Sequence, residues 1–212
     1  MLEPKVMIGI PMPKDMSIDL RTSYWCYREL DFGVGWILQA ECGGSSARNK
    51  NVIIDTLLKG DYTHLFCLNN DTWTLPNAIN KLLAHDKDIV AGITPGFFGE
   101  FFWMGQIKKN VVIKLNEIPD KLTPAARGGG PGMLIKRKVL ETMEFPWFDF
   151  VQVKVGQETS EDYHFSDKAV DMGFEVWIDP NVMMNHNHNG VDLLGLAQAV
   201  ARPKEEMCKC QS

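Results

Sequence analysis

Short apolar runs alternate with amphipathic stretches through the first 95 residues of the chain. The apolar runs predict buried strands at residues 5–10, 35–42, 64–69 and 88–93. The stretches between them have apolar residues at helical spacing, and they predict helices from Ser17 to about Leu30, up to Leu58, and from Pro76 onwards. Alternating strands and helices are typical of a parallel sheet with right-handed crossovers, so this half is expected to be a nucleotide-binding α/β half-domain.

The pattern is less regular in the second half. An aromatic segment at 97–103 is followed by predicted strands at 111–115, 133–135 and 174–178, and by predicted helices at 136–143, 161–172 and 191–201. The loop at 127–132 is rich in glycine but lacks the Lys-Ser/Thr pair that follows a phosphate-binding loop. Its glycines are expected to allow close backbone approach or to form a mobile cover over a site.

The composition is that of a globular protein and excludes one class of partner. The 212 residues are 45% apolar and 23% charged, with a formal net charge of −5. No basic patch is visible that would neutralise phosphates, so nonspecific nucleic-acid binding is not expected. An acidic protein that binds an anionic nucleotide needs a local cation, which favours a metal held by carboxylates.

The cysteines and the apolar runs indicate a cytoplasmic protein. The cysteines are Cys26, Cys42, Cys67, Cys208 and Cys210, an odd number without the spacing of a disulfide framework. The last two leave open a metal clip, although no second pair lies near them. We find no signal peptide and no apolar run of about 18 residues, so no transmembrane segment is predicted.

A cluster of oxygen ligands follows the third predicted strand. Asn69, Asn70 and Asp71 stand directly after the apolar run that begins at His64. Ligands of open α/β sheets bind at the carboxyl ends of the strands, and Mg²⁺ or Mn²⁺ prefers oxygen donors. Asn and Asp are also common in turns at strand ends, so a purely structural turn is the alternative.

Three further positions carry possible chemistry. Glu161 and Asp162 follow the predicted N-cap Ser160, where they either complement the helix dipole or supply a general base. His186 and His188 alternate, so both point to one face of an extended segment. One of them is a candidate metal ligand, and a polar turn without a role is the alternative. Arg48 opens a helix against its dipole, a place suited to a phosphate contact or simply exposed.

Taken in order, these segments resemble the GT-A glycosyltransferases, the nucleotide-sugar enzymes of the family-2 kind. The resemblance covers roughly residues 5–190. The matching segments are Ile8-Gly9-Ile10-Pro11, Ala47-Arg48-Asn49, His64 to Asp71 with Leu75-Pro76, Lys87 to Gly92, Gly130 to Arg137, Ser160 to Phe165, and Val176 to Pro180 followed by His186.

The resemblance implies a single GT-A (Rossmann-like) α/β domain over residues 1–200, with a mainly parallel central sheet flanked by helices. Its nucleotide-binding half would be about 1–95, its acceptor half about 96–200, and 201–212 would be a flexible tail. It implies a metal-dependent transfer of a sugar from a UDP- or GDP-linked donor to a hydroxyl of a glycan, protein or lipid-linked acceptor, with inversion at the anomeric carbon.

The resemblance also implies roles for individual residues. Asp162 would be the catalytic base and Glu161 would orient the acceptor or the base. Asp71 and His186 would hold Mn²⁺ or Mg²⁺. The nucleotide would be contacted by Pro11, Glu41, Arg48, Asn69 and Asn70. The sugar or acceptor would be contacted by Gly132, Trp103 and Phe101. The aromatic rings of Trp103 and Phe101 could stack on sugar faces or pack in the core.

One position departs from the family pattern. The metal motif is usually Asp-x-Asp, whereas Asn69 stands in the first place and only the last Asp is kept, as Asp71. A catalytically silent nucleotide- or glycan-binding relative is therefore one alternative. A sugar nucleotidyltransferase is another, although the glycine-rich signature that such enzymes carry after the first strand is missing at Pro11 to Lys14.

Overall fold

The structure is a computed structural model, and it describes residues 3–29, 35–41 and 43–201. Of the predicted tail 201–212, residue 201 ends α6 and residues 202–212 lie outside the described residues. The helices are α1 (Leu20–Glu29), α2 (Ser46–Lys59), α3 (Ala78–Leu83), α4 (Arg137–Thr142), α5 (Glu161–Asp171) and α6 (Leu193–Ala201). The strands are β1 (Lys5–Pro11), β2 (Gly35–Glu41), β3 (His64–Cys67), β4 (Thr72–Thr74), β5 (Ile89–Phe97), β6 (Phe101–Met104), β7 (Ile113–Lys114), β8 (Thr123–Ala125), β9 (Met133–Lys136), β10 (Val151–Lys154), β11 (Gln157–Thr159), β12 (Val176–His188) and β13 (Val191–Asp192).

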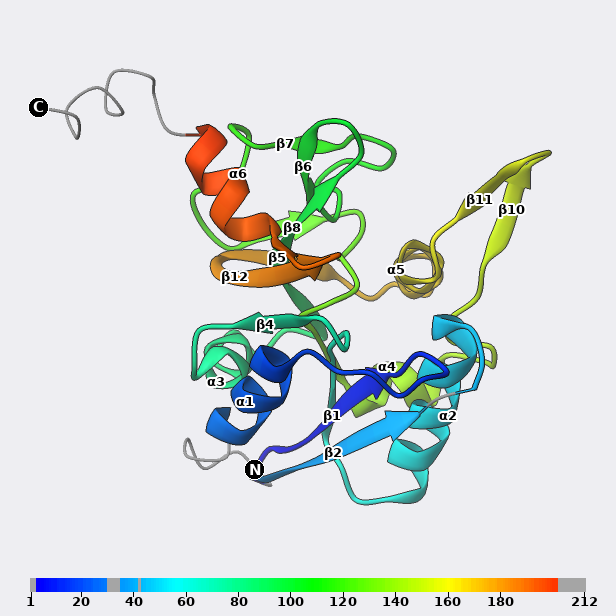
Figure 1. The fold of residues 1–212 in the computed structure, drawn as a ribbon. Helices are drawn as coiled ribbons and strands as arrows, with labels where there is room; N and C mark the ends of the chain where they lie inside the picture. Colours follow the sequence, from blue (N-terminus) through cyan, green and yellow to red (C-terminus); the bar gives the residue numbers. More distant parts are fainter. Residues whose placement is uncertain (1–2, 30–34, 42, 202–212) are drawn as a thin grey trace, which may run out of the picture.

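A large mixed sheet organises the described part of the chain (Figure 1). Its main path runs β13-β12-β5-β9-β3-β1-β2. β1 pairs in parallel with β2 and β3, and β5 pairs in parallel with β12. β9 lies between β3 and β5 and is antiparallel to both. The four strands of the first half therefore run in one direction as predicted, but a strand from the second half separates β3 from β5.

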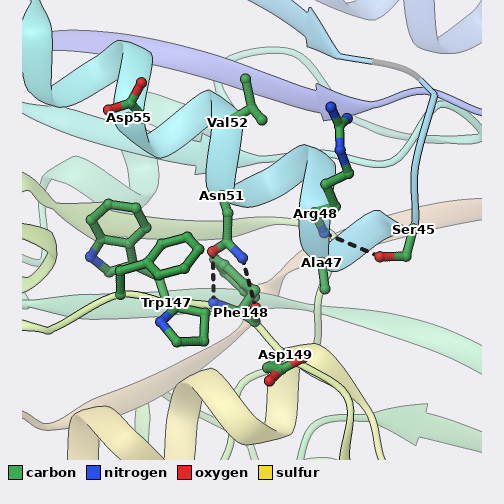
Figure 2. Close-up of a pocket in the computed structure, with 11 residues that line it drawn as sticks. Ser45, Ala47, Arg48, Asn51, Val52, Asp55, Trp147, Phe148 and Asp149 are labelled. Atoms are coloured by element: carbon green, nitrogen blue, oxygen red, sulfur yellow. Dashed lines mark hydrogen bonds between the residues drawn. The ribbon is translucent and has the colours of Figure 1, made fainter.

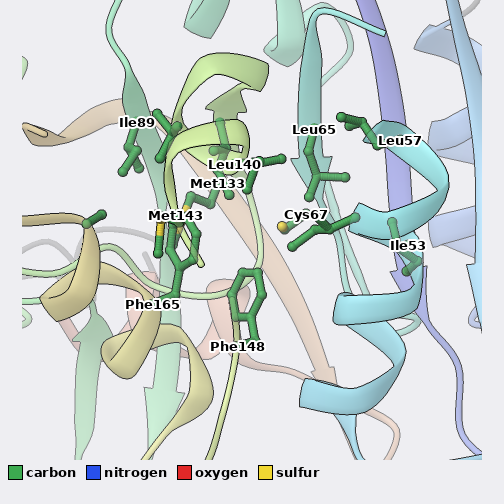
Figure 3. Packing of buried hydrophobic residues seen from close by; sticks show 14 of the residues in the cluster. Ile53, Leu57, Leu65, Cys67, Ile89, Met133, Leu140, Met143, Phe148 and Phe165 are labelled. Carbon is green, nitrogen blue, oxygen red and sulfur yellow. The ribbon is translucent and has the colours of Figure 1, made fainter. Parts of the chain in front are cut away.

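Each face of this sheet is covered by its own set of helices. In β3, the side chains of Leu65 and Cys67 pack with residues of α2, α4 and α5, whereas Phe66, and Leu68 directly after the strand, pack with residues of α1 and α3. This is the alternation expected of a strand buried on both faces. Figure 3 shows the first of these layers, where Phe148 and Phe165 stack with their ring centroids 4.6 Å apart.

Several element boundaries differ from the predicted ones for local reasons. α1 begins at Leu20 because Asp19, not Ser17, accepts the first backbone N–H groups with its side chain and its carbonyl. α3 begins at Ala78, two residues after Pro76, because residues 72–74 extend as β4 along β12. β12 continues through Pro180 to His188, well beyond the predicted end at 178.

The second half adds two projections to the sheet. The end of β5 pairs with β6, and β6 with β7, to form an antiparallel arm; β6 and β7 lie at the top of Figure 1, next to α6. β10 and β11 form a separate hairpin that extends away from the body of the molecule just before α5. Within the described residues, none of the helices has the length and apolar character needed to cross a membrane.

Candidate active site

The predicted nucleotide residues lie at the carboxyl ends of β1, β2 and β3. Pro11 ends β1 in register with Glu41, the last residue of β2. The side-chain amide of Asn49 donates to the carbonyl of Met12 at 3.1 Å, which fixes the first turn of α2 beside the end of β1. Arg48 is exposed on that turn, and its Nη1 lies 3.2 Å from Asn49 Oδ1. These residues therefore line the sheet edge where α/β folds bind ligands.

A tight turn after β3 presents the predicted metal ligand. Thr72 closes the turn, because its side-chain oxygen accepts the amide N–H of Asn69 at 3.1 Å. Asn70 does not point into the site, since its side-chain amide donates to the carbonyl of Ser17 at 3.0 Å. Asp71 lies beside β12, and its Oδ2 is 3.6 Å from Nε2 of His186. The fold thus joins the strand-end carboxylate to the late histidine.

The Asp71–His186 pair has the character of an incomplete ligand set. Asp71 Oδ1 is buried and has no hydrogen-bond partner, an arrangement that needs a reason in a folded protein. Burial opposes protonation of His186, but its contacts with Asp71 outweigh burial and raise its pKa. His188 is exposed and its ring centroid lies 6.0 Å from that of His186. Among the described residues, no group of three or more His, Cys, Asp or Glu side chains gathers to hold a metal.

A buried lysine holds the predicted acidic pair. Lys50 on α2 is 3% exposed, and its Nζ lies 3.1 Å from Glu161 Oε1 and also donates to Asp162 Oδ1. The hydroxyl of Ser46, one turn earlier, donates to the same Glu161 oxygen. Ser160 caps α5 as predicted, accepting the Tyr163 N–H at 3.4 Å. The two carboxylates therefore do more than complement the helix dipole.

The charged groups of this cluster shift one another's pKa values. Burial alone would lower the pKa of Lys50, but the carboxylates of Asp162 and Glu161 raise it, so the lysine stays charged. Burial favours protonation of Glu161, yet Lys50 and Ser46 lower its pKa. The pKa of Asp162 is raised, because burial and the charge of Glu161 outweigh Lys50. A carboxylate with a raised pKa is a stronger base than a free one, as proton abstraction requires.

Lys50 did not emerge from the sequence as a site residue, although the sequence holds a signal for it. It falls on the same helical stripe as Ile53, Ile54 and Leu57, which is the face of α2 that packs on the sheet. A charged residue on an apolar stripe must be paired when the helix packs. That pattern predicts a buried partner for Lys50, but not which one.

One cavity connects the strand-end turn with the acidic pair. It has a volume of about 640 Å³, and its lining includes Asn69, Gly130, Ser160, Asp162 and Tyr163. Gly130 lies against the Asp162 carboxylate so closely that an added Cβ would be 2.0 Å from Oδ2. The predicted close backbone approach of the glycine-rich loop is thereby found, and it occurs at the candidate base.

Two residues expected near the sugar have structural roles in the fold. Trp103 is 5% exposed and packs in the core, where its indole N–H donates to the Leu115 carbonyl at 3.3 Å, so its ring is closed to a sugar. Gly132 has φ +86 and an added Cβ would be 2.8 Å from Met184, so this glycine serves the turn into β9. Phe101, the other expected aromatic, does line the cavity.

A second cavity lies between α2 and the segment 145–149 (Figure 2). It has a volume of about 740 Å³ and shares no lining residue with the first. Asn51 closes one side, donating to the Phe148 carbonyl at 2.9 Å and accepting the Phe148 N–H at 3.0 Å. Arg48 belongs to this rim, but Figure 2 shows its guanidinium directed away from Trp147 and Phe148.

The comparisons with known proteins find similar solved structures but no similar family model or curated sequence. No protein-family model matches the chain. No curated protein matches it either. Among solved structures, A197 from STIV is similar with a TM-score of 0.64 at 15% identity, over 88% of this chain and 87% of that chain.

Two other neighbours handle nucleotides. The inositol-1-phosphate CTP transferase from T. maritima is similar with a TM-score of 0.51 at 14% identity, over 86% of this chain and 88% of that chain. GalNAc-T7, solved with UDP, GalNAc and Mn²⁺, has a TM-score of 0.52 at 11% identity, over 88% of this chain and 44% of that one. Similarity at these identities shows the fold alone, and the chain has the predicted GT-A-like α/β fold.

Proposed function

We propose that this protein is a glycosyltransferase that moves a sugar from a UDP- or GDP-linked donor to an acceptor hydroxyl. One observation carries the proposal. A single cavity runs from Asn69, which lies beside the Asp71–His186 pair, to Asp162, which is paired with Lys50. A sugar transfer needs a place for a diphosphate and a base for the acceptor within reach of one another. GalNAc-T7, with the same fold, was solved with a nucleotide, a sugar and a metal.

The donor would lie along the carboxyl ends of the first strands. Pro11 and Glu41, adjacent in register, would contact the base and ribose. Arg48, exposed on the first turn of α2, would approach the diphosphate together with helix N–H groups. Asn69 and the backbone of Asn70 would complete this side. These contacts follow the strand-end geometry of nucleotide-binding folds.

Asp71 and His186 would hold a divalent cation, Mn²⁺ or Mg²⁺. The unpaired, buried Asp71 Oδ1 and the neighbouring imidazole fit such an ion, which takes oxygen donors and accepts nitrogen. The described residues bring no third His, Cys, Asp or Glu side chain to this pair, so the ion would also depend on the bound diphosphate and water. When bound, the ion neutralises the charge of the departing nucleotide diphosphate.

Asp162 would act on the acceptor. Its carboxylate takes the proton of the acceptor hydroxyl while that oxygen bonds to the anomeric carbon, and the bond from this carbon to the diphosphate oxygen breaks. Attack from the face opposite the leaving group inverts the anomeric configuration. Lys50 favours the ionised form of Asp162 and holds its carboxylate in place, and Glu161 raises the basicity of that carboxylate while it shares the same lysine.

Nucleotide binding tests the donor half of the proposal. Calorimetric titration with UDP and GDP, with and without Mn²⁺, should show metal-dependent binding of one of them. Asp71→Ala and His186→Ala should each weaken it about tenfold or more. Asp61→Ala, at a carboxylate whose side chain is 78% exposed, is the matched control and should change nothing. Absence of binding to either nucleotide with metal present would contradict the proposal.

A single substitution then separates catalysis from binding. Asp162→Asn keeps the size of the side chain and removes the base, so turnover should fall by about a thousandfold while nucleotide affinity stays the same. The readout is release of the nucleotide diphosphate from a panel of nucleotide sugars, with and without acceptors. Wild-type protein that binds nucleotide but never turns over would identify the silent relative instead.

Nucleotidyl transfer is the second candidate, and the similarity to the inositol-1-phosphate CTP transferase favours it. Such an enzyme consumes a nucleoside triphosphate and releases pyrophosphate. Incubation with CTP, UTP or GTP and a sugar 1-phosphate therefore distinguishes the two reactions by product. Pyrophosphate release that depends on Asp71 would replace the first proposal with this one.

A further inference from the structure

One side of the β5–β6–β7 arm is largely apolar and remains uncovered within the described residues. Trp103 and Ile113 pack inward with the core, whereas Phe102, Met104 and Val112 line the cavity that contains Asp162. Phe101 lines the same cavity, and so do two charged residues of the arm, Glu100 and Lys114. We call Phe98, Phe102, Met104 and Val112 the apolar wall.

The side chains of the apolar wall are positioned by contacts within the arm. Phe98, from the turn between β5 and β6, stacks on Phe102 with ring centroids 5.9 Å apart and planes at 13°. Gly96 makes room for the Phe102 ring, because an added Cβ would be 2.4 Å from it. Phe98 nevertheless remains 88% exposed and Val112 52% exposed. Adjacent exposed apolar side chains beside a cavity are typical of a ligand-binding groove.

Three polar side chains, those of Glu100, Gln106 and Lys114, line the cavity together with the apolar wall. The Gln106 side-chain oxygen is already occupied, since it accepts from Asn110 N at 2.7 Å and from Arg127 Nη1 at 3.0 Å. Lys114 lies 3.8 Å from Glu117 and its side chain is 74% exposed. The hydroxyl-binding groups Asn69, Ser160 and Asp162 stand at the other end. The end formed by the wall is therefore mainly apolar, with two charged side chains beside it.

We infer that the acceptor carries an apolar chain next to its reacting hydroxyl, with the chain on the apolar wall and the hydroxyl at Asp162. This inference rests on the proposed glycosyl transfer for the identity of the reacting group. The distribution of side chains favours such an acceptor over a second saccharide, whose several hydroxyls would lie unpaired against phenylalanine, methionine and valine.

Binding of n-alkyl β-D-glucosides, from methyl to octyl, tests the inference directly. Calorimetry is done below the micelle concentration of each compound. Each methylene that the wall buries should tighten binding by about fourfold. Phe98→Ala should flatten this dependence without affecting folding, because the ring is largely exposed, and Phe98→Trp should retain it. Phe145→Ala, at a ring that is 72% exposed outside this cavity, is the matched control.

Three outcomes would overturn the inference. A series that binds equally at every chain length, or not at all, would remove the apolar chain from the acceptor. Equal effects of Phe98→Ala and Phe145→Ala would place the chain elsewhere. Binding to phosphatidylcholine vesicles without a chain-length dependence for the monomers would make the wall a membrane contact. Nucleotide binding is measured separately, so failure of the glycosyltransferase proposal is distinguishable from each of these.

Discussion

Replacing Lys50 by methionine removes the one cation from a buried cluster of two carboxylates. Methionine keeps most of the side-chain volume, so the change is mainly electrostatic. Lys50 Nζ lies 3.1 Å from Glu161 Oε1. At an effective dielectric constant of about 20, two unit charges at that distance attract by about 5 kcal/mol. Desolvation offsets part of this attraction, and breaking a buried pair from one side typically costs about 3–5 kcal/mol. We expect the lower value, about 3 kcal/mol.

The stability that Lys50→Met loses should depend on pH in a definite direction. Without Lys50, Glu161 and Asp162 face one another in a buried site, and the pKa of the pair rises above that of the unfolded chain. A raised acid pKa contributes stability that is complete at low pH and is lost as the pH rises through the folded pKa. The variant should therefore differ from wild type more at about pH 8 than at about pH 5.

Urea denaturation followed by circular dichroism at several pH values measures this difference. Lys59→Met is the control on the same helix, because its side chain is 74% exposed and pairs with exposed Asp55. It should cost about 0.5 kcal/mol or less at every pH. Adding Glu161→Gln to Lys50→Met should recover part of the loss. A loss equal to the control, or one that is constant with pH, would refute the buried cluster.

Three further changes test other parts of the structure. Burial, and secondarily the charge of Lys136, lower the pKa of His64 to about 4. Because the pKa of this histidine is higher in the unfolded chain, the free energy of unfolding should fall as the pH drops from about 6.5 to about 4. The expected fall is about 2 kcal/mol after allowing for the partial exposure of the ring. His64→Gln should remove most of that fall in urea midpoints, and an unchanged fall would assign it to other groups. Asp167→Asn should cost about 2–3 kcal/mol in thermal or urea unfolding, because the buried Arg127 loses its counter-charge and one of its two acceptors, which lie at 2.8 and 2.6 Å. Phe165→Ala should cost about 3–4 kcal/mol by opening a cavity beside Phe148; a loss below 1 kcal/mol would contradict the packing.

Local patterns in the sequence were sufficient for most elements of the fold. The apolar run that begins at His64 identified β3, and Gly60 was placed correctly at the end of α2, where its N–H bonds to the Leu57 carbonyl. Ser160 was likewise the cap of α5. These features depend on residues within a few positions of one another, so periodicity and capping reveal them. Boundaries set by distant pairing, such as β4 against β12, were missed.

Tertiary structure alone decided how the candidate site is assembled. Lys50 meets Glu161 across 111 positions of sequence, and Asp71 meets His186 only because β4 pairs with β12. A strand's own pattern shows that it is buried but not which neighbour it pairs with, so β9 could not be placed between β3 and β5 beforehand. The sequence also could not decide the role of Trp103. An aromatic ring packs in the core or stacks on a ligand according to the face of the arm on which it lies. Contacts of long sequence separation depend on the global packing, which local propensity does not encode.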